Sequence, residues 1–300
     1  MFLAAIDLGT QTFRAAIAEI CKQDILPVHS RLLNARLGEV LWTGELTDST
    51  LRCIDEIRST LARYAVSRVR VCGTEAMRRL REQYPDQFDL LQARLELPIE
   101  ILPPFVEGQL TALGAVSALN LRGKRVRQPL LVLDVGGGST EAILCNEEGI
   151  TVESMPIGAV TFHKASLKSL TLLKAPPYSE AGIILATGGT ATTLGAMILE
   201  LTEYTPLKIR GLCVKVDTID DWIYRLTSLD LEERKTLRGL EPERADIIIP
   251  GLRILRACLS HLGAPEITIS DGGLLMGILI DLTKKEFKDH DRLDWRRLYI

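Results

Sequence analysis

The chain has 300 residues, of which 46% are hydrophobic and 25% are charged, and its formal net charge is −3. This length predicts two domains, and the composition is that of an ordinary globular protein. The slightly acidic balance excludes a general nucleic-acid-binding protein, which needs a strongly basic domain, while leaving room for a local basic groove that binds a polyanion.

Targeting and redox signals are absent from the sequence. No apolar run is long enough to cross a bilayer, and Met1–Leu3 enter a predicted strand without the pattern of a signal peptide. The six cysteines are scattered, without the spacing of a zinc site, which indicates reduced thiols. We therefore expect a cytoplasmic protein that does not interact with membranes.

The first part of the chain predicts three strands followed by alternating helices and strands. The predicted elements are strands over 2–6, 13–20 and 25–33, a helix over 51–65, a strand over 69–72, a helix that Thr74 caps, a strand over 99–102 and a helix over 106–119. Pro103 and Pro104 end the strand that precedes the last of these helices.

The second part of the chain restarts this pattern. Its predicted elements are strands over 130–134, 141–145 and 151–155, a helix over 159–167, a strand over 183–186, a helix over 194–201, a helical stretch after Val216, a helix over 245–262, a strand over 266–269 and a helix over 274–282. The repeated pattern favours an α/β fold with two ribonuclease-H-like domains, 1–121 and 122–282. The basic segment 121–128 forms the seam, and the tail 283–300 is predicted to pack back on the first domain as a helix.

Two apolar strands lead into the same kind of glycine turn. The chain reads Ile6-Asp7-Leu8-Gly9-Thr10-Gln11-Thr12 near its start and Leu133-Asp134-Val135-Gly136-Gly137-Gly138-Ser139-Thr140 near its middle. In both, the backbone can turn tightly and aim N–H groups at an anion while the aspartate holds a cation. Two copies indicate duplicated domains that face each other across a cleft and hold a phosphate chain and its metal ion from both sides.

A third glycine turn predicts a further phosphate site. The segment Ala186-Thr187-Gly188-Gly189-Thr190-Ala191-Thr192 follows an apolar strand and opens onto the predicted helix over 194–201. The start of a helix binds anions through its free N–H groups and its dipole.

The ordered motifs of the chain resemble those of the exopolyphosphatase / guanosine pentaphosphate phosphohydrolase family. The resemblance covers nearly the whole chain and is carried by Asp7–Thr12, Gly73–Arg78, Glu107 with Leu110 and Leu113-Gly114, Asp134–Glu141, Pro156–Val160, Gly188–Thr192, Arg244–Asp246 and Ser270–Leu274. It implies two domains of the actin-like ATPase superfamily around a central cleft. It also implies hydrolysis of the terminal phosphoanhydride bond of polyphosphate or guanosine pentaphosphate with Mg²⁺ or another divalent cation.

The same resemblance implies a role for each candidate residue. Glu107 would be the catalytic carboxylate, Asp7 and Asp134 would hold the metal, and Glu141 would bind the metal or position the water. The phosphate-binding residues would be Gly9, Thr10, Gln11, Thr12, Arg78, Gly136, Gly137, Gly138, Ser139, Gly188, Gly189 and Thr190. These roles suit phosphoryl transfer, which needs backbone donors and cations around the phosphate oxygens and a carboxylate beside the water. A homodimer is compatible with the sequence.

Several structural alternatives remain open at this stage. Glu107 could stabilise a helix dipole by about 0.3–1 kcal/mol, Glu141 could point outward from a strand, and Arg78 could form a surface ion pair. Asp7 and Asp134 could be ordinary turn residues. The competing functions are a sensor that binds polyphosphate or a guanosine polyphosphate without efficient turnover, and a phosphotransferase of the same fold.

Overall fold

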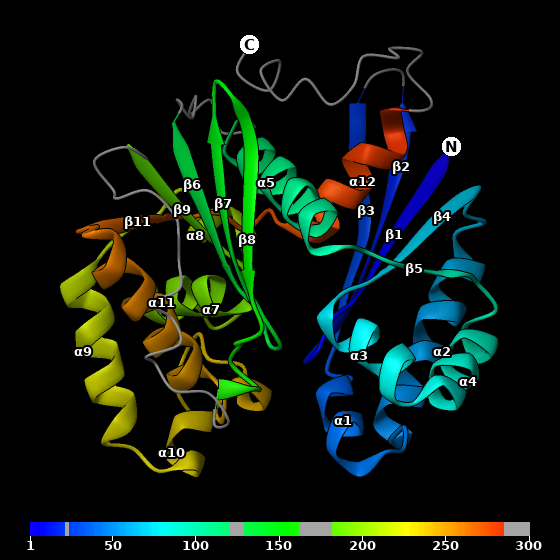
Figure 1. The fold of residues 1–300 in the computed structure, drawn as a ribbon, viewed down its shortest axis with the longest axis horizontal. Coiled ribbons are helices and arrows are strands. Elements are labelled where there is room, and N and C mark those ends of the chain that lie inside the picture. The colour runs from blue at the N-terminus through cyan, green and yellow to red at the C-terminus, as the bar shows by residue number, and fades with distance from the viewer. Residues whose placement is uncertain (22–23, 121–128, 163–181, 285–300) are drawn as a thin grey trace.

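The computed structural model describes residues 1–21, 24–120, 129–162 and 182–284, which form two β-sheets with helices packed against both (Figure 1). The predicted seam and almost all of the predicted tail lie outside these residues. Among the described residues, no helix is both long enough and apolar enough to cross a membrane.

The first sheet has five strands in the order β3-β2-β1-β4-β5. They are β1 (Phe2–Leu8), β2 (Phe13–Cys21), β3 (Asp24–Leu33), β4 (Arg68–Gly73) and β5 (Ile99–Ile101). The first three strands form an antiparallel meander, and β4 and β5 then add parallel to β1. Apart from Asp7, the side chains of β1 are apolar, and residues 3–8 are buried on both faces, as expected for a strand at the centre of the sheet.

The second sheet repeats this order and adds one strand. Its strands are β6 (Leu130–Val135), β7 (Thr140–Asn146), β8 (Gly149–Met155), β9 (Ile183–Thr187), β10 (Cys213–Lys215) and β11 (Glu266–Ile269). The order β8-β7-β6-β9-β11 matches the first sheet strand for strand, and β10 pairs antiparallel with the edge strand β11. This repetition confirms the predicted α/β fold of two ribonuclease-H-like domains.

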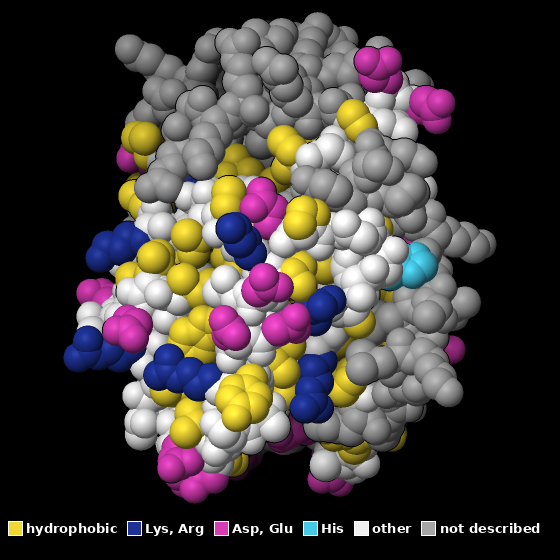
Figure 2. All heavy atoms as spheres, turned by 90° about the vertical axis from the view of Figure 1, so that its left-hand side faces the viewer, with side chains coloured by type: hydrophobic (Ala, Val, Ile, Leu, Met, Phe, Trp, Pro, Cys, Tyr) yellow, Lys and Arg dark blue, Asp and Glu magenta, His cyan; other side chains and the backbone are white. Residues whose placement is uncertain are grey.

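The helices connect and cover the sheets. In the first half they are η1 (Leu37–Glu39), α1 (Val40–Thr43), α2 (Asp48–Arg63), α3 (Glu75–Gln83), α4 (Pro85–Leu95) and α5 (Pro104–Asn120). In the second half they are α7 (Gly188–Ile198), α8 (Pro206–Ile209), α9 (Val216–Thr227), α10 (Leu231–Lys235), η4 (Pro242–Arg244), α11 (Ile248–Leu262) and α12 (Leu274–Lys284). The outer face of the second domain, over α9, carries acidic and basic side chains among apolar ones (Figure 2).

Helices α5 and α12 are exchanged between the domains. Helix α5 belongs to the first half of the chain, but its alanine-rich face packs on β6 and β7 of the second sheet through Ala112, Val116 and Leu119. Helix α12 comes from the second half, yet it packs on β1 and β2 of the first sheet through Ile278 and Leu282. Both helices therefore lie between the two sheets (Figure 1).

Glycines allow α5 and α12 to cross in backbone contact. A Cβ atom on Gly114 would overlap the carbonyl oxygen of Gly273, and one on Gly277 would overlap the carbonyl oxygen of Leu110. The turn Ser270–Gly273, part of the motif Ser270–Leu274, thus serves this crossing, because a Cβ on Gly272 would also overlap Gly114.

Two local predictions differ from the structure, and some elements were not predicted. Helix α7 begins at Gly188 rather than 194, because Gly188 has φ +81° and turns the chain straight from β9 into the helix. The described start of the predicted helix 159–167 is a turn, because the N–H groups of Ala159 and Val160 bond to carbonyls of the second glycine turn. Residues 163–167 lie outside the described residues. Strand β10 and the separate helix α4 were not predicted.

Candidate active site

The two aspartate turns have the same backbone geometry. In the first, the N–H of Gly9 donates to the Thr12 carbonyl at 3.1 Å, and in the second the N–H of Gly136 donates to the Ser139 carbonyl at 3.0 Å. Each turn connects the two strands of an antiparallel hairpin, β1 and β2 in one domain and β6 and β7 in the other. The prediction that the two aspartate segments form the same kind of turn is therefore confirmed for the backbone.

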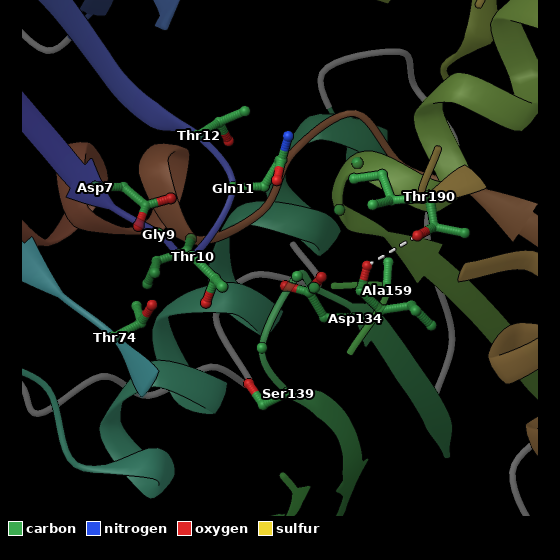
Figure 3. A pocket seen from close by; sticks show the side chains of 18 of the residues that line it. Asp7, Gly9, Thr10, Gln11, Thr12, Thr74, Asp134, Ser139, Ala159 and Thr190 are labelled. Atoms are coloured by element: carbon green, nitrogen blue, oxygen red, sulfur yellow. Dashed lines mark hydrogen bonds between the residues drawn. The ribbon is translucent and has the colours of Figure 1, made fainter. Parts of the chain in front are cut away.

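The two turns face each other. A Cβ atom on Gly138 would lie 2.5 Å from both Oγ1 of Thr10 and Oε2 of Glu75, and one on Gly137 would lie 3.2 Å from the Cβ of Thr10. Turns that are 127 residues apart in the sequence thus form opposite walls of one cleft of about 780 Å³. Figure 3 shows Asp7 and the residues 9–12 on one side and Asp134 and Thr190 on the other.

Fifteen of the sixteen predicted site residues line this cleft. They are Asp7, Gly9, Thr10, Gln11, Thr12, Glu107, Asp134, Gly136, Gly137, Gly138, Ser139, Glu141, Gly188, Gly189 and Thr190. The exception is Arg78, whose Nη1 donates to the Leu102 carbonyl at 2.6 Å and to Oε2 of Glu107 at 2.9 Å. The structure therefore places Arg78 behind Glu107 rather than on the cleft wall.

The third glycine turn completes the wall of the second domain. Oγ1 of Thr190 donates to the Val135 carbonyl at 3.1 Å, which joins the start of α7 to the second aspartate turn (Figure 3). Arg244 also lines the cleft, and its guanidinium lies so close to Gly189 that a Cβ there would overlap it. The first turn of α7 and Arg244 thus present N–H donors and a cation at the same place.

Arg14 is a cleft residue that we did not predict. On β2 it pairs across the hairpin with Asp7, and its Nη2 lies 2.9 Å from Oδ2 of that aspartate. In the second domain the corresponding partner of Asp134 is Glu141. Both partners follow their aspartate by seven residues, so alignment of the two repeats places Arg14 at the position of Glu141.

Thr74, which we predicted only as a helix cap, and Glu75 also lie at the site without a predicted role in it. Thr74 is the N-cap residue of α3, although its side chain makes no cap hydrogen bond, and it lines the cleft. Glu75 is buried, and its Oε2 lies close to Gly138 of the second glycine turn. Oε2 of Glu75 has no hydrogen-bond partner among the described residues, and burial raises the pKa of this carboxyl. Both residues lie at the start of the helix after β4, the position that Gly188 and Gly189 occupy after β9.

The two glutamates of the cleft hold their protons unusually tightly. Burial raises the pKa of Glu107 to about 7, although the Arg78 guanidinium acts in the opposite direction. Burial, together with the charges of Glu107 and Asp134, raises the pKa of Glu141 well above its usual value. Ser154 Oγ donates to Oε1 of Glu141 at 2.8 Å and fixes its orientation.

The two aspartates are also held in an environment that disfavours their charge. Burial raises the pKa of Asp134 to about 6, and it raises the pKa of Asp7 as well, in both cases against the lowering effect of Arg14. Oδ1 of Asp7 is buried and has no hydrogen-bond partner among the described residues. Four carboxylates therefore share one cleft with too little positive charge to balance them.

Such a cleft provides the hard oxygen ligands that Mg²⁺ prefers. In the described part of the chain, no three His, Cys, Asp or Glu side chains are grouped closely enough to hold an ion by themselves. Mg²⁺ is usually bound by one or two carboxylates together with phosphate oxygens of the substrate. Asp7 and Asp134 could hold a cation in this way, and the cation would reduce the repulsion among the carboxylates.

Comparisons with known proteins find similar sequences and a similar fold. The pattern of the Ppx/GppA phosphatase family matches residues 17–286. The chain is 28% identical to exopolyphosphatase 2 of Mycobacterium tuberculosis over 93% of this chain and 98% of that protein. It is 24% identical to the guanosine-5'-triphosphate,3'-diphosphate pyrophosphatase of Photobacterium profundum over 96% of this chain and 60% of that protein. The crystal structure of the Aquifex aeolicus Ppx/GppA family member matches with a TM-score of 0.77 and 28% identity, over 97% of this chain and 99% of that chain.

Proposed function

The chain belongs to the Ppx/GppA phosphatase family, and on this basis we propose that it is a phosphohydrolase that releases the terminal phosphate of polyphosphate or of a phosphorylated guanosine nucleotide. The single observation that carries the proposal is the position of Glu107 and Glu141 in the cleft that the three glycine turns line. Carboxylates beside a set of anion-binding N–H groups suit an attack of water on a bound phosphoryl group.

Glu107 is the general base of the proposed reaction. A base works best when its pKa is near the working pH, and burial brings the pKa of Glu107 to about 7. The water oxygen bonds to the terminal phosphorus, Glu107 accepts the proton, and the bridging P–O bond breaks with its electrons passing to the leaving phosphate. Glu141 orients the water. Its carboxyl is held in one orientation for this role by the hydrogen bond that Ser154 donates to it.

The glycine turns bind the phosphate chain. N–H groups of the turns after Asp7 and Asp134, with the first turn of α7, stabilise the charge that spreads over the phosphoryl oxygens. Arg14 and Arg244 add positive charge from opposite domains. A divalent cation, held by Asp7 and Asp134 together with phosphate oxygens, would supply further neutralisation of that charge.

The proposal is tested by measuring phosphate release from long polyphosphate, guanosine pentaphosphate and ATP, each with and without Mg²⁺. We expect Mg²⁺-dependent release from at least one of the first two substrates and little from ATP. Glu148→Gln, which changes an exposed glutamate between β7 and β8, is the control for Glu107→Gln. Tight binding without release from any substrate would refute the hydrolase and indicate a sensor instead.

A further inference from the structure

We infer that Glu75, a buried glutamate that takes no part in the proposed reaction, repels the freed orthophosphate and keeps the binding of this product to the cleft weak. The inference rests on the proposed function and adds a residue that controls product retention. Glu75 is the first residue of α3 and is only 9% exposed. Its Oε2 has no hydrogen-bond partner among the described residues. Such a buried oxygen costs stability, so a benefit to the fold does not explain it.

The unpartnered oxygen lies where the two aspartate turns meet. A Cβ atom on Gly138 would lie 2.5 Å from both Oε2 of Glu75 and Oγ1 of Thr10. A carboxylate of the first domain is therefore packed against the backbone of the phosphate-binding turn in the second domain. Gly138 and Thr10 both line the cleft. A phosphate bound between the turns therefore lies within range of this charge.

The charge of this carboxylate is poorly neutralised. Oε1 of Glu75 lies 3.5 Å from Nη1 of Arg79, and 35% of the Arg79 side chain is exposed, so solvent weakens the pair. Arg78 also lowers the pKa of Glu75, as Arg79 does, but burial has the larger effect and raises it. The guanidinium of Arg78 is itself bonded to Glu107 at 2.9 Å. Ionised Glu75 thus leaves negative charge beside the second turn.

The usual role of a glutamate at this position does not account for its burial. In the first turn of a helix, a glutamate stabilises the helix dipole by about 0.3–1 kcal/mol, and it does so at the surface. The internal repeat gives a contrast, because the strand order places β4 and β9, which precede α3 and α7, at equivalent positions. At the start of α7, the guanidinium of Arg244 occupies the place where a side chain on Gly189 would lie. One helix start thus brings a cation to the cleft, and the other brings a carboxylate.

Repulsion by Glu75 matters more for the product than for the substrate. Glu141, which orients the water in the proposed reaction, follows the second turn closely, so the phosphate under attack lies near Gly138. A phosphate chain is also bound through its inner phosphates, and these contacts hold its terminal phosphate in place against the repulsion. Hydrolysis removes that attachment. The freed orthophosphate keeps its negative charge but loses the contacts of the chain, so it binds weakly.

The inference is tested by calorimetric titration with orthophosphate and Mg²⁺ at about pH 9. Strongly buried glutamates reach pKa values of about 8–9, so Glu75 carries its charge at this pH. Glu75→Gln keeps the shape of the side chain and removes the charge. It should bind orthophosphate at least about tenfold more tightly than the wild-type protein, the lower end of the effect of a charge at about 4–6 Å.

Glu82→Gln is the matched control, because it removes an exposed glutamate from the same helix. It should change the affinity for orthophosphate by less than about twofold, since salt screens exposed charges. Glu75→Ala should change the affinity in the same direction as Glu75→Gln, and it is the second test if the glutamine variant does not fold.

The hydrolysis assay gives an independent measurement. In Glu75→Gln, the inhibition constant of orthophosphate and the KM for polyphosphate should both fall, whereas the loss of a merely structural contact would raise them. Unchanged or weaker binding of orthophosphate by a folded Glu75→Gln protein would overturn the inference. Tighter binding of orthophosphate without hydrolysis of any substrate overturns only the proposed hydrolase. Hydrolysis with an unchanged affinity for orthophosphate overturns only this inference.

Discussion

Removing the charge of Arg78 should move the pH dependence of the reaction rather than weaken phosphate binding. Nη1 of Arg78 lies 2.9 Å from Oε2 of Glu107 and favours the ionised carboxylate, which counteracts the effect of burial. In Arg78→Gln this opposition is lost, so the pKa of Glu107 rises further. The base is then protonated over a wider pH range, and the acid limb of the rate profile moves to higher pH.

The size of the effect follows from the geometry. A cation within about 4–6 Å lowers a carboxyl pKa by about 1–3. The ion pair is partly buried, with 23% and 10% of the two side chains exposed, so solvent screens it only in part. Since the pKa of Glu107 is about 7, roughly half of the wild-type protein carries the active base at neutral pH. The variant should keep about a tenth or less and should therefore be about five times slower or worse at pH 7.

The assay is the rate of phosphate release from pH 5.5 to 9.5 at saturating substrate, with KM measured at each pH. We expect the rate of Arg78→Gln to recover toward the wild-type plateau at alkaline pH with little change in KM. Arg79→Gln is the matched control, since Arg79 lies on the same helix and pairs with Glu75 instead. A large rise in KM at every pH, with an unmoved acid limb, would refute this reasoning and restore Arg78 as a phosphate ligand.

Four further predictions follow from the site. Glu107→Gln should fold normally but lose roughly 10²- to 10⁴-fold in kcat, about 3–5 kcal/mol of barrier, measured by phosphate release. Asp134→Asn should raise the Mg²⁺ concentration needed for half-maximal rate, because an amide is a poorer ligand than a carboxylate; an unchanged Mg²⁺ dependence would make Asp134 only a turn residue. Gly188→Ala should destabilise the protein by more than Gly263→Ala in urea unfolding, since both glycines have positive φ but only the Gly188 Cβ would overlap Oδ1 of Asp134. The pKa values of Glu107 and Asp134 are raised in the folded, ligand-free protein, so between roughly pH 4.5 and 7 it binds more protons than the unfolded chain. Its free energy of unfolding should therefore fall as the pH rises through this window, and the fall should be less steep in Glu107→Gln.

The fold and most of the cleft could be predicted because the same sequence pattern, a strand that ends in an aspartate and a glycine turn, occurs twice in the chain. An aspartate at the end of a strand, followed by a glycine turn, restricts the backbone strongly enough that residues 9–12 and 136–139 adopt the same turn. The family resemblance then predicted a catalytic role for Glu107, which no local pattern separates from an ordinary glutamate in the first turn of a helix, and the structure places it in the cleft.

Contacts that depend on distant parts of the chain were beyond prediction. Arg78 has the positive charge that suits a phosphate ligand. In the structure, however, its guanidinium donates hydrogen bonds to Glu107 at the start of α5 and to the carbonyl of Leu102 just before that helix. Arg14 lies seven residues after Asp7, as Glu141 does after Asp134, but this spacing alone does not show that the side chain contacts the aspartate. Only the pairing of β1 with β2 brings it to Asp7.

The exchange of α5 and α12 means that one face of each sheet is covered by a helix from the other half of the chain (Figure 1). A fragment that ends at residue 121 would expose the face of β1 and β2 that α12 normally covers, and it would also expose the apolar face of α5. A fragment that begins at residue 129 would lack α5 over β6 and β7. Expressed separately, the two fragments should aggregate, and expressed together they should reassemble through the interlocked helices. The protein should accordingly unfold in a single cooperative transition despite its two sheets.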